Sequence, residues 1–108
     1  MIVLVFKYLL PKGYRGISLF PFIIVSNKNC SEDLVLLNHE KIHIRQQLEM
    51  LVIPFYIWYG IEFLVRFFQY RNWTLAYKYI SFEQEAYTNE KDLNYLKKRS
   101  FWEFYNFL

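Results

Sequence analysis

The two histidines of the chain, His39 and His43, lie four residues apart in a segment whose composition is typical of an α-helix. Residues at this spacing lie one turn apart on the same helix face, so the two imidazoles can approach one cation together. Glu40 lies one step around the helix, where its carboxylate can face a water molecule on that cation without binding the cation itself. These residue types and their spacing predict a metal site with His39 and His43 as ligands and Glu40 as a general base.

A catalytic zinc ion takes three protein ligands and leaves its remaining position to water, so the histidine pair needs one further residue. The sequence holds no third histidine and a single cysteine, Cys30, which makes a carboxylate the natural choice. Glu83 and Glu85 are the two candidates, and on a helix they would point about 160° apart. Glu83 is preferred because the small Ala86, on the same face, would let its helix come close to the histidine helix. Glu85 and Glu90 are expected at the surface.

The combination of His-Glu-Lys-Ile-His at 39–43 with Glu-Gln-Glu-Ala at 83–86 resembles the H-E-x-x-H and E-x-x-A motifs of the gluzincin metallopeptidases, especially their minimal versions. The aromatic segment between the motifs also resembles the membrane-embedded peptidases of penicillin-sensing receptors. Segments 38–47 and 82–87 are similar to those of a group of small uncharacterised bacterial proteins of this length. The resemblance implies a Zn²⁺ ion bound by His39, His43 and Glu83, with Glu40 as the base.

Two further expectations follow from the same resemblance. Many gluzincins carry an Asp four residues after the ligand Glu, where it orients a zinc-bound histidine, but this chain has Tyr87 there. The family also implies an edge strand before the motif helix that holds an extended peptide by β-addition, and segment 17–25 occupies that place. Tyr87 and Tyr79 are candidates for the group that stabilises an oxyanion.

The elements that position these residues are expected to be one strand region and three helices. Segment 11–16 has the composition of a turn, and the apolar run 17–25 predicts an edge strand or a bulged strand because Pro21 cannot donate to a central ladder. A helix is expected from about Glu32 to about Met50, with Ser31 or a neighbour as its cap and Pro54 bending or ending it. A second, aromatic helix is expected over about 55–69. A third is expected from near Trp73, with one face that carries Tyr79, Glu83, Ala86, Tyr87 and Glu90.

The composition limits the class of protein. With 108 residues the chain is long enough for one domain, 1–108, and its 55% hydrophobic and 22% aromatic residues exclude a disordered chain. So many rings predict that some face a membrane surface, a partner or a second copy of the chain. If the second helix reaches Phe68 it could nearly span a bilayer, with Glu62 and Arg66 requiring partners. The formal charge of +3 is too small and too scattered to indicate nucleic acid as a partner.

The sequence therefore predicts an α+β, predominantly α, minimal zincin-like domain that binds Zn²⁺ and hydrolyses peptide bonds of a peptide or protein substrate. Two alternatives remain open: a zinc-binding regulatory or structural module without activity, and a small membrane-associated protein that binds no metal. The single cysteine favours a reducing compartment, so a cytoplasmic or a membrane-associated location fits.

Overall fold

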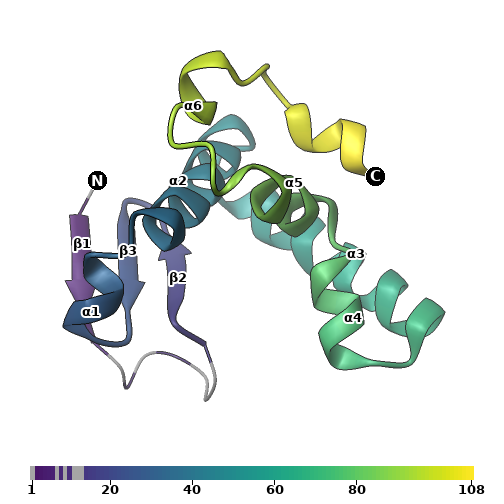
Figure 1. The fold of residues 1–108 in the computed structure, drawn as a ribbon. Helices are drawn as coiled ribbons and strands as arrows, with labels where there is room; N and C mark the ends of the chain where they lie inside the picture. The colour runs from purple at the N-terminus through teal and green to yellow at the C-terminus, as the bar shows by residue number, and fades with distance from the viewer. Residues whose placement is uncertain (1, 7, 9, 11–13) are drawn as a thin grey trace.

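The computed structural model describes residues 2–6, 8, 10 and 14–108. Three short strands, β1 (Ile2–Val5), β2 (Gly16–Leu19) and β3 (Phe22–Val25), form one sheet in the order β1-β3-β2. β1 runs parallel to β3, with Ile2 opposite Phe22, and β2 runs antiparallel to β3, with Gly16 opposite Val25. The helices cover one side of this sheet and extend away from it (Figure 1). The α+β class expected from the sequence is confirmed.

The apolar run 17–25 is a hairpin, so the expectation of one edge or bulged strand was wrong. Pro21 lies in the two-residue turn between β2 and β3, where the pairing of these strands does not require the backbone N–H that proline lacks. β2 is an edge strand, whereas the β-branched residues of β3 make it the central strand. The expected turn over 11–16 falls partly outside the described residues.

The helical part begins with α1 (Lys28–Ser31), followed by the longer α2 (Leu34–Glu49). Asp33, rather than Ser31, caps α2, because its carboxylate accepts hydrogen bonds from the backbone N–H groups of Val35 and Leu36. After a short break the chain continues as α3 (Ile53–Tyr70), and Pro54 lies in the first turn of α3 rather than inside α2. Arg71 ends α3 in a left-handed conformation.

The third expected helix is divided in two. α4 (Trp73–Lys78) and α5 (Ser81–Asn89) are separated at Tyr79 and Ile80, and α6 (Tyr95–Lys98) and the 3₁₀ helix η2 (Glu103–Phe107) follow. Glu62 of α3 holds the start of α5, because its carboxylate accepts hydrogen bonds from the backbone N–H and the hydroxyl of Ser81. This carboxylate fixes the position from which α5 presents Glu83.

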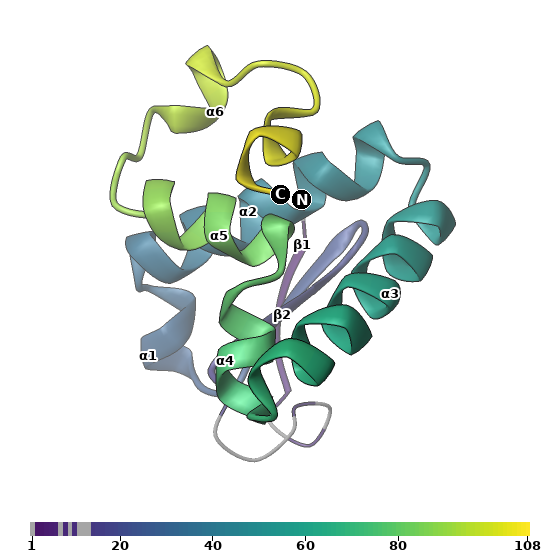
Figure 2. The same cartoon turned by 90° about the vertical axis from the view of Figure 1, so that its right-hand side faces the viewer.

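α5 lies across α2, and together they form the centre of the molecule (Figure 2). Ala86 of α5 and Ile42 of α2 belong to one buried cluster with Tyr95, as the small size of Ala86 predicted. A second cluster joins Phe82 of α5 to Phe55 of α3 and Phe104 of η2. These contacts set the distance between the histidine helix and the helix that carries Glu83.

α3 packs on the rest of the molecule with one face and leaves the other in solvent. The exposed apolar residues on the outer face, here called the α3 ridge, are Ile53, Ile57, Ile61, Leu64 and Phe68. Among the described residues no single helix is both long and apolar enough to cross a bilayer. α2 and α3 meet that requirement only as a pair, and a bend of 113° separates them.

Candidate metal centre

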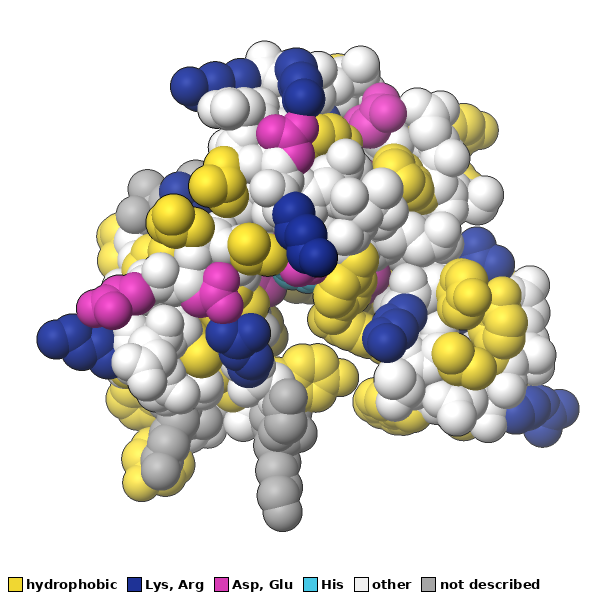
Figure 3. Space-filling view, in the orientation of Figure 1, with side chains coloured by type: hydrophobic (Ala, Val, Ile, Leu, Met, Phe, Trp, Pro, Cys, Tyr) yellow, Lys and Arg dark blue, Asp and Glu magenta, His cyan; other side chains and the backbone are white. Residues whose placement is uncertain are grey.

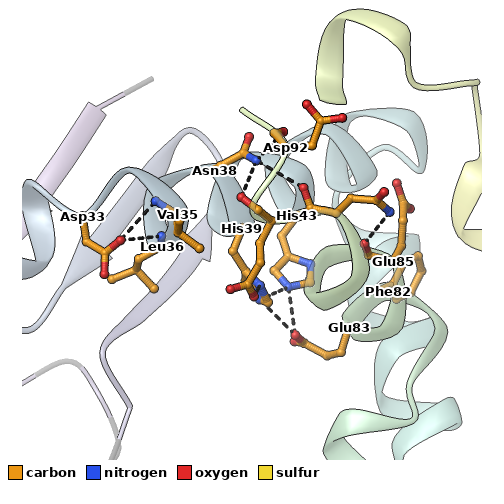
Figure 4. Close-up of polar contacts among 12 residues, drawn as sticks. Asp33, Val35, Leu36, Asn38, His39, His43, Phe82, Glu83, Glu85 and Asp92 are labelled. Atoms are coloured by element: carbon orange, nitrogen blue, oxygen red, sulfur yellow. Dashed lines mark hydrogen bonds and ion pairs between the residues drawn. The ribbon is translucent and has the colours of Figure 1, made fainter. Parts of the chain in front are cut away.

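His39 and His43 point from α2 toward Glu83 of α5, and all three side chains are buried (Figure 4). The two Nε2 atoms lie 3.2 Å apart, and Oε1 of Glu83 lies 3.2 Å from Nε2 of His39 and 3.1 Å from Nε2 of His43. In a tetrahedral zinc site with bonds of about 2.0–2.2 Å, ligand atoms are roughly 3.3–3.6 Å apart. The structure thus brings the three predicted ligand atoms to nearly the separation that one small cation requires.

Glu40 borders the same point but makes no comparable contact. His39, Glu40 and His43 form a buried His-Glu-His group that could bind a metal ion, with one ligand atom of each within 4.8 Å of the others. Oε2 of Glu40 is the one buried side-chain oxygen or nitrogen of the described residues that has no hydrogen-bond partner. Glu83 therefore has the contacts of a ligand, whereas Glu40 keeps a free oxygen beside the histidines.

Both histidines are oriented through their second ring nitrogen. Nδ1 of His39 lies 3.0 Å from Oε1 of Glu90, and Nδ1 of His43 lies 2.8 Å from Oε1 of Gln46. The amide orientation of Gln46 is fixed, because its Nε2 donates to the backbone carbonyl of Phe82. Since both oxygens can only accept, each Nδ1 donates, so each imidazole in its neutral form directs the lone pair of Nε2 to the point that the two histidines share with Glu83.

Glu90 was not expected in this role. The resemblance to gluzincins implied an orienting residue four positions after Glu83, at Tyr87, and Glu90 was expected at the surface. Glu90 is instead half-buried, because the end of α5 turns its carboxylate toward α2. The edge of the Tyr87 ring packs on the ring of His39, with centroids 4.5 Å apart. A carboxylate–histidine pair is therefore present, but its carboxylate comes one turn later than expected.

Glu85 is fully buried, so its expected surface position was wrong. It points to the opposite side of α5 from Glu83 and accepts hydrogen bonds from Gln46, Tyr95 and Arg99. Arg99 also forms an ion pair with Glu49 of α2, at 2.6 Å, and its side chain has no exposed surface. Burial of Glu85 is tolerated because this arginine neutralises it, and no periodic signal in the sequence links the two positions.

Two tyrosines near the centre, Tyr59 and Tyr77, were not predicted from the sequence. The hydroxyl of Tyr59 in α3 donates to Oε2 of Glu83 at 2.7 Å, which leaves Oε1 toward the histidines. Tyr77 of α4 lines the same cavity as Glu40, His43 and Glu83. Of the two tyrosines expected as oxyanion donors, Tyr87 contacts His39, whereas Tyr79 stacks on Tyr70 outside this cavity.

The charges of the centre are strongly coupled. Burial lowers the pKa of His43, but Glu83, Glu40 and Gln46 together raise it to a net value of about 9. Although burial opposes it, His43 and His39 hold the pKa of Glu83 well below its usual range. Burial raises the pKa of Glu40. Without a metal ion, a protonated His43 therefore faces the negatively charged carboxylate of Glu83.

A cavity of about 530 Å³ opens beside the centre, between β2 on one side and α3 and α4 on the other. Figure 3 shows the surface hollowed between these two parts of the molecule, with histidine and acidic atoms at the inner end. Glu40, His43 and Glu83 supply the ionisable groups of the centre to this lining, and most of the remaining wall is apolar. A molecule in this cavity would therefore contact the candidate metal centre directly.

The free edge of β2 borders this cavity. The backbone N–H of Ser26 donates to the carbonyl of Arg15 across the hairpin. In an antiparallel pair the backbone groups of alternate residues point toward and away from the partner strand, so those of Gly16, Ser18 and Phe20 point toward the free edge. Gln47 bonds both the carbonyl of Ser18 and the N–H of Phe20, each at 2.9 Å.

Three backbone groups of this edge are left without a partner among the described residues: the N–H and carbonyl of Gly16 and the N–H of Ser18. They lie at the end of the strand near Glu40, because a Cβ added to Gly16 would lie 3.6 Å from Cγ of Glu40. An extended chain could therefore pair with this short stretch only.

Comparisons of the chain with family models, with curated proteins and with solved structures found no match.

Proposed function

We propose that this chain is a zinc-dependent metallopeptidase with a zincin-like arrangement of its motif helices. The observation that carries the proposal is the convergence of His39, His43 and Glu83 within 3.2 Å of one another, from two helices, around a buried point. A His-His-Glu set with an open remaining position is typical of catalytic zinc. The orientation of both imidazoles by Glu90 and Gln46 further supports a ligand role over a chance contact.

The residues divide into those that hold the ion and one that moves a proton. A zinc ion held by His39, His43 and Glu83 would supply a polarised carbonyl and an activated water. Glu40 accepts a proton from the attacking water and delivers it to the leaving amine. Its unpartnered Oε2 and raised pKa suit this role, because a base that is already hydrogen-bonded or strongly acidic would accept a proton less readily.

A peptide substrate is favoured by the strand edge beside the centre. The free N–H and carbonyl of Gly16 and the N–H of Ser18 offer backbone hydrogen bonds to an extended chain. Such pairing would lay a peptide bond across the inner end of the cavity, near Glu40 and His43. Small molecules without a peptide backbone would not use these groups.

The test compares the parent with two variants of the centre. His39→Ala should lose both zinc binding and cleavage of a peptide library, because it removes a ligand. Glu40→Gln should keep zinc binding and lose about 10²- to 10⁴-fold in rate, the usual contribution of a general base. Glu32→Gln, which changes an exposed glutamate in the same way, is the matched control and should retain both properties.

The outcomes separate the proposal from its alternatives. A parent that binds zinc but cleaves no member of a broad library would refute the enzyme and leave a zinc-binding module. A parent that binds no zinc, measured by equilibrium dialysis, would refute the metal centre itself. Cleavage by Glu40→Gln at the parental rate would show that Glu40 is not the base.

A further inference from the structure

The wall of the 530 Å³ cavity contains one residue whose presence the fold does not require, Gly60. It lies near the middle of the 18-residue α3, in the turn that also presents Tyr59 to the centre. Glycine in a helix interior is less favourable than alanine by roughly 0.5–1 kcal/mol. A glycine at this position therefore calls for a local reason.

Neither backbone conformation nor packing supplies that reason. Gly60 has no left-handed φ, and a Cβ added to it would meet no atom within 4 Å. A close approach between α3 and a neighbouring element is thus excluded as the cause. Gly60 borders the cavity, so a larger side chain at this position would extend into the cavity.

The chemistry of the wall indicates what occupies this space. Apart from the acidic and histidine groups at the inner end and a few polar groups of β2 and α2, the cavity is lined by apolar side chains. The largest of these are Phe55, Tyr59, Phe63, Trp73 and Tyr77. The volume lies within the range of about 300–1,000 Å³ that is typical of ligand pockets. A charged side chain would lose its hydration here without gaining a partner along most of the wall.

The free edge of β2 offers a peptide few hydrogen bonds, so most of the binding free energy must come from contacts in the cavity. Because Gln47 and Tyr56 already bond the carbonyl of Ser18, only three backbone groups of β2 remain for a ligand. So few hydrogen bonds contribute little net free energy in water. Selectivity must therefore come from the side chain that enters the cavity.

We infer that this cavity is a specificity pocket for one bulky apolar side chain of the substrate, of leucine size or larger, and that Gly60 keeps it open. The inference deepens the proposed function, because the residue that enters the pocket belongs to the peptide whose bond lies at the centre. Full burial of a leucine or phenylalanine side chain corresponds to roughly 10- to 100-fold tighter binding than exposure.

The experiment uses the cobalt-loaded full chain and four probes that bind metal through one common group. These are the hydroxamic acids of N-acetyl-phenylalanine, N-acetyl-leucine, N-acetyl-alanine and N-acetyl-aspartate, titrated by calorimetry. The phenylalanine and leucine probes should bind roughly 10- to 100-fold more tightly than the other two. Equal affinities for all four would overturn the inference.

Substitutions at Gly60 test the residue itself. Gly60→Leu should remove at least tenfold of the preference for the phenylalanine probe, whereas the matched control Gly60→Ala should keep most of it. Both should bind cobalt as the parent does, because position 60 contacts no proposed ligand. If Gly60→Leu fails to give the parental circular dichroism spectrum, Gly60→Met takes its place. Parental affinity of the substituted chain for the phenylalanine probe would overturn the role of Gly60.

Failure of the metal centre can be told apart from failure of the pocket. Cobalt binding is followed independently by its visible absorption in the absence of probe. If no cobalt binds, the metal-free chain is titrated with N-acetyl-phenylalanine amide and N-acetyl-aspartic acid amide by nuclear magnetic resonance. Binding of the first with shifts at Phe55 and Phe63 supports the pocket without the metal, and binding of neither overturns it.

Discussion

The buried carboxylate of Glu40 leads to a prediction about stability. Its Oε2 has no hydrogen-bond partner, and Glu83 adds a second negative charge nearby. A buried unpaired acceptor costs about 1–3 kcal/mol, and more when it is charged. Glu40→Gln removes the charge at nearly constant shape. We expect it to raise the free energy of unfolding of the metal-free chain by about 1–3 kcal/mol.

The assay is urea unfolding followed by circular dichroism at pH 7.5 in the presence of a chelator. For a domain of this size each kcal/mol should raise the thermal midpoint by roughly 4–5 °C, which gives a second readout. The pH dependence has a defined sign. Burial raises the pKa of Glu40, so the parent gains stability as the pH falls through that pKa, and the advantage of Glu40→Gln should shrink there.

Glu83→Gln is the matched control, because it makes the same change in a carboxylate that both histidines and Tyr59 contact. It should destabilise the chain, since a paired buried charge is lost. If Glu40→Gln is no more stable than the parent under these conditions, the carboxylate of Glu40 is not an unpaired buried group, and its Oε2 no longer supports a role as a base.

Three further predictions concern the metal, its support and the surface. Because His43 has a pKa of about 9 in the metal-free chain, zinc must displace a proton, so its apparent affinity should rise about tenfold per pH unit from pH 7 to 9 and then level off; an affinity independent of pH would contradict this. Glu90→Gln should lower zinc affinity about 10- to 100-fold in competition titrations with a chelator, because it weakens the orientation of His39; parental affinity would remove Glu90 from the centre. The α3 ridge predicts that the chain associates with lipid vesicles or with itself, and Ile57→Glu should reduce the association that sedimentation detects. A parent that is a monodisperse monomer and does not co-sediment with vesicles would contradict this prediction.

Residues related by helical periodicity could be predicted from the sequence. The spacing of His39 and His43 placed both imidazoles on one face of α2, and the small Ala86 indicated close packing on Ile42. These relations depend only on local geometry within one helix and on side-chain size. The ligand role of Glu83 remains a prediction, although its carboxylate lies where that role requires.

Relations between distant segments could not be predicted in the same way. The break between α4 and α5 depends on Glu62, which bonds the start of α5 from nineteen residues earlier. The burial of Glu85 depends on Arg99, fourteen residues later. Glutamate and arginine are usually exposed to solvent, so neither residue type alone indicates burial. Only the folded chain brings Glu62 to Ser81 and Arg99 to Glu85.

The ion pair between Arg99 and Glu85 has a consequence for the order of events during synthesis. All three proposed ligands have been made once Glu83 is added, but Glu49 and Glu85 have no buried cation until Arg99 follows. Without Arg99 the two buried carboxylates would repel each other, which disfavours the packing of α5 on α2 that holds Glu83 beside the histidines. In this order, the cation that supports the packing of α5 on α2 is the last part of the centre to be completed.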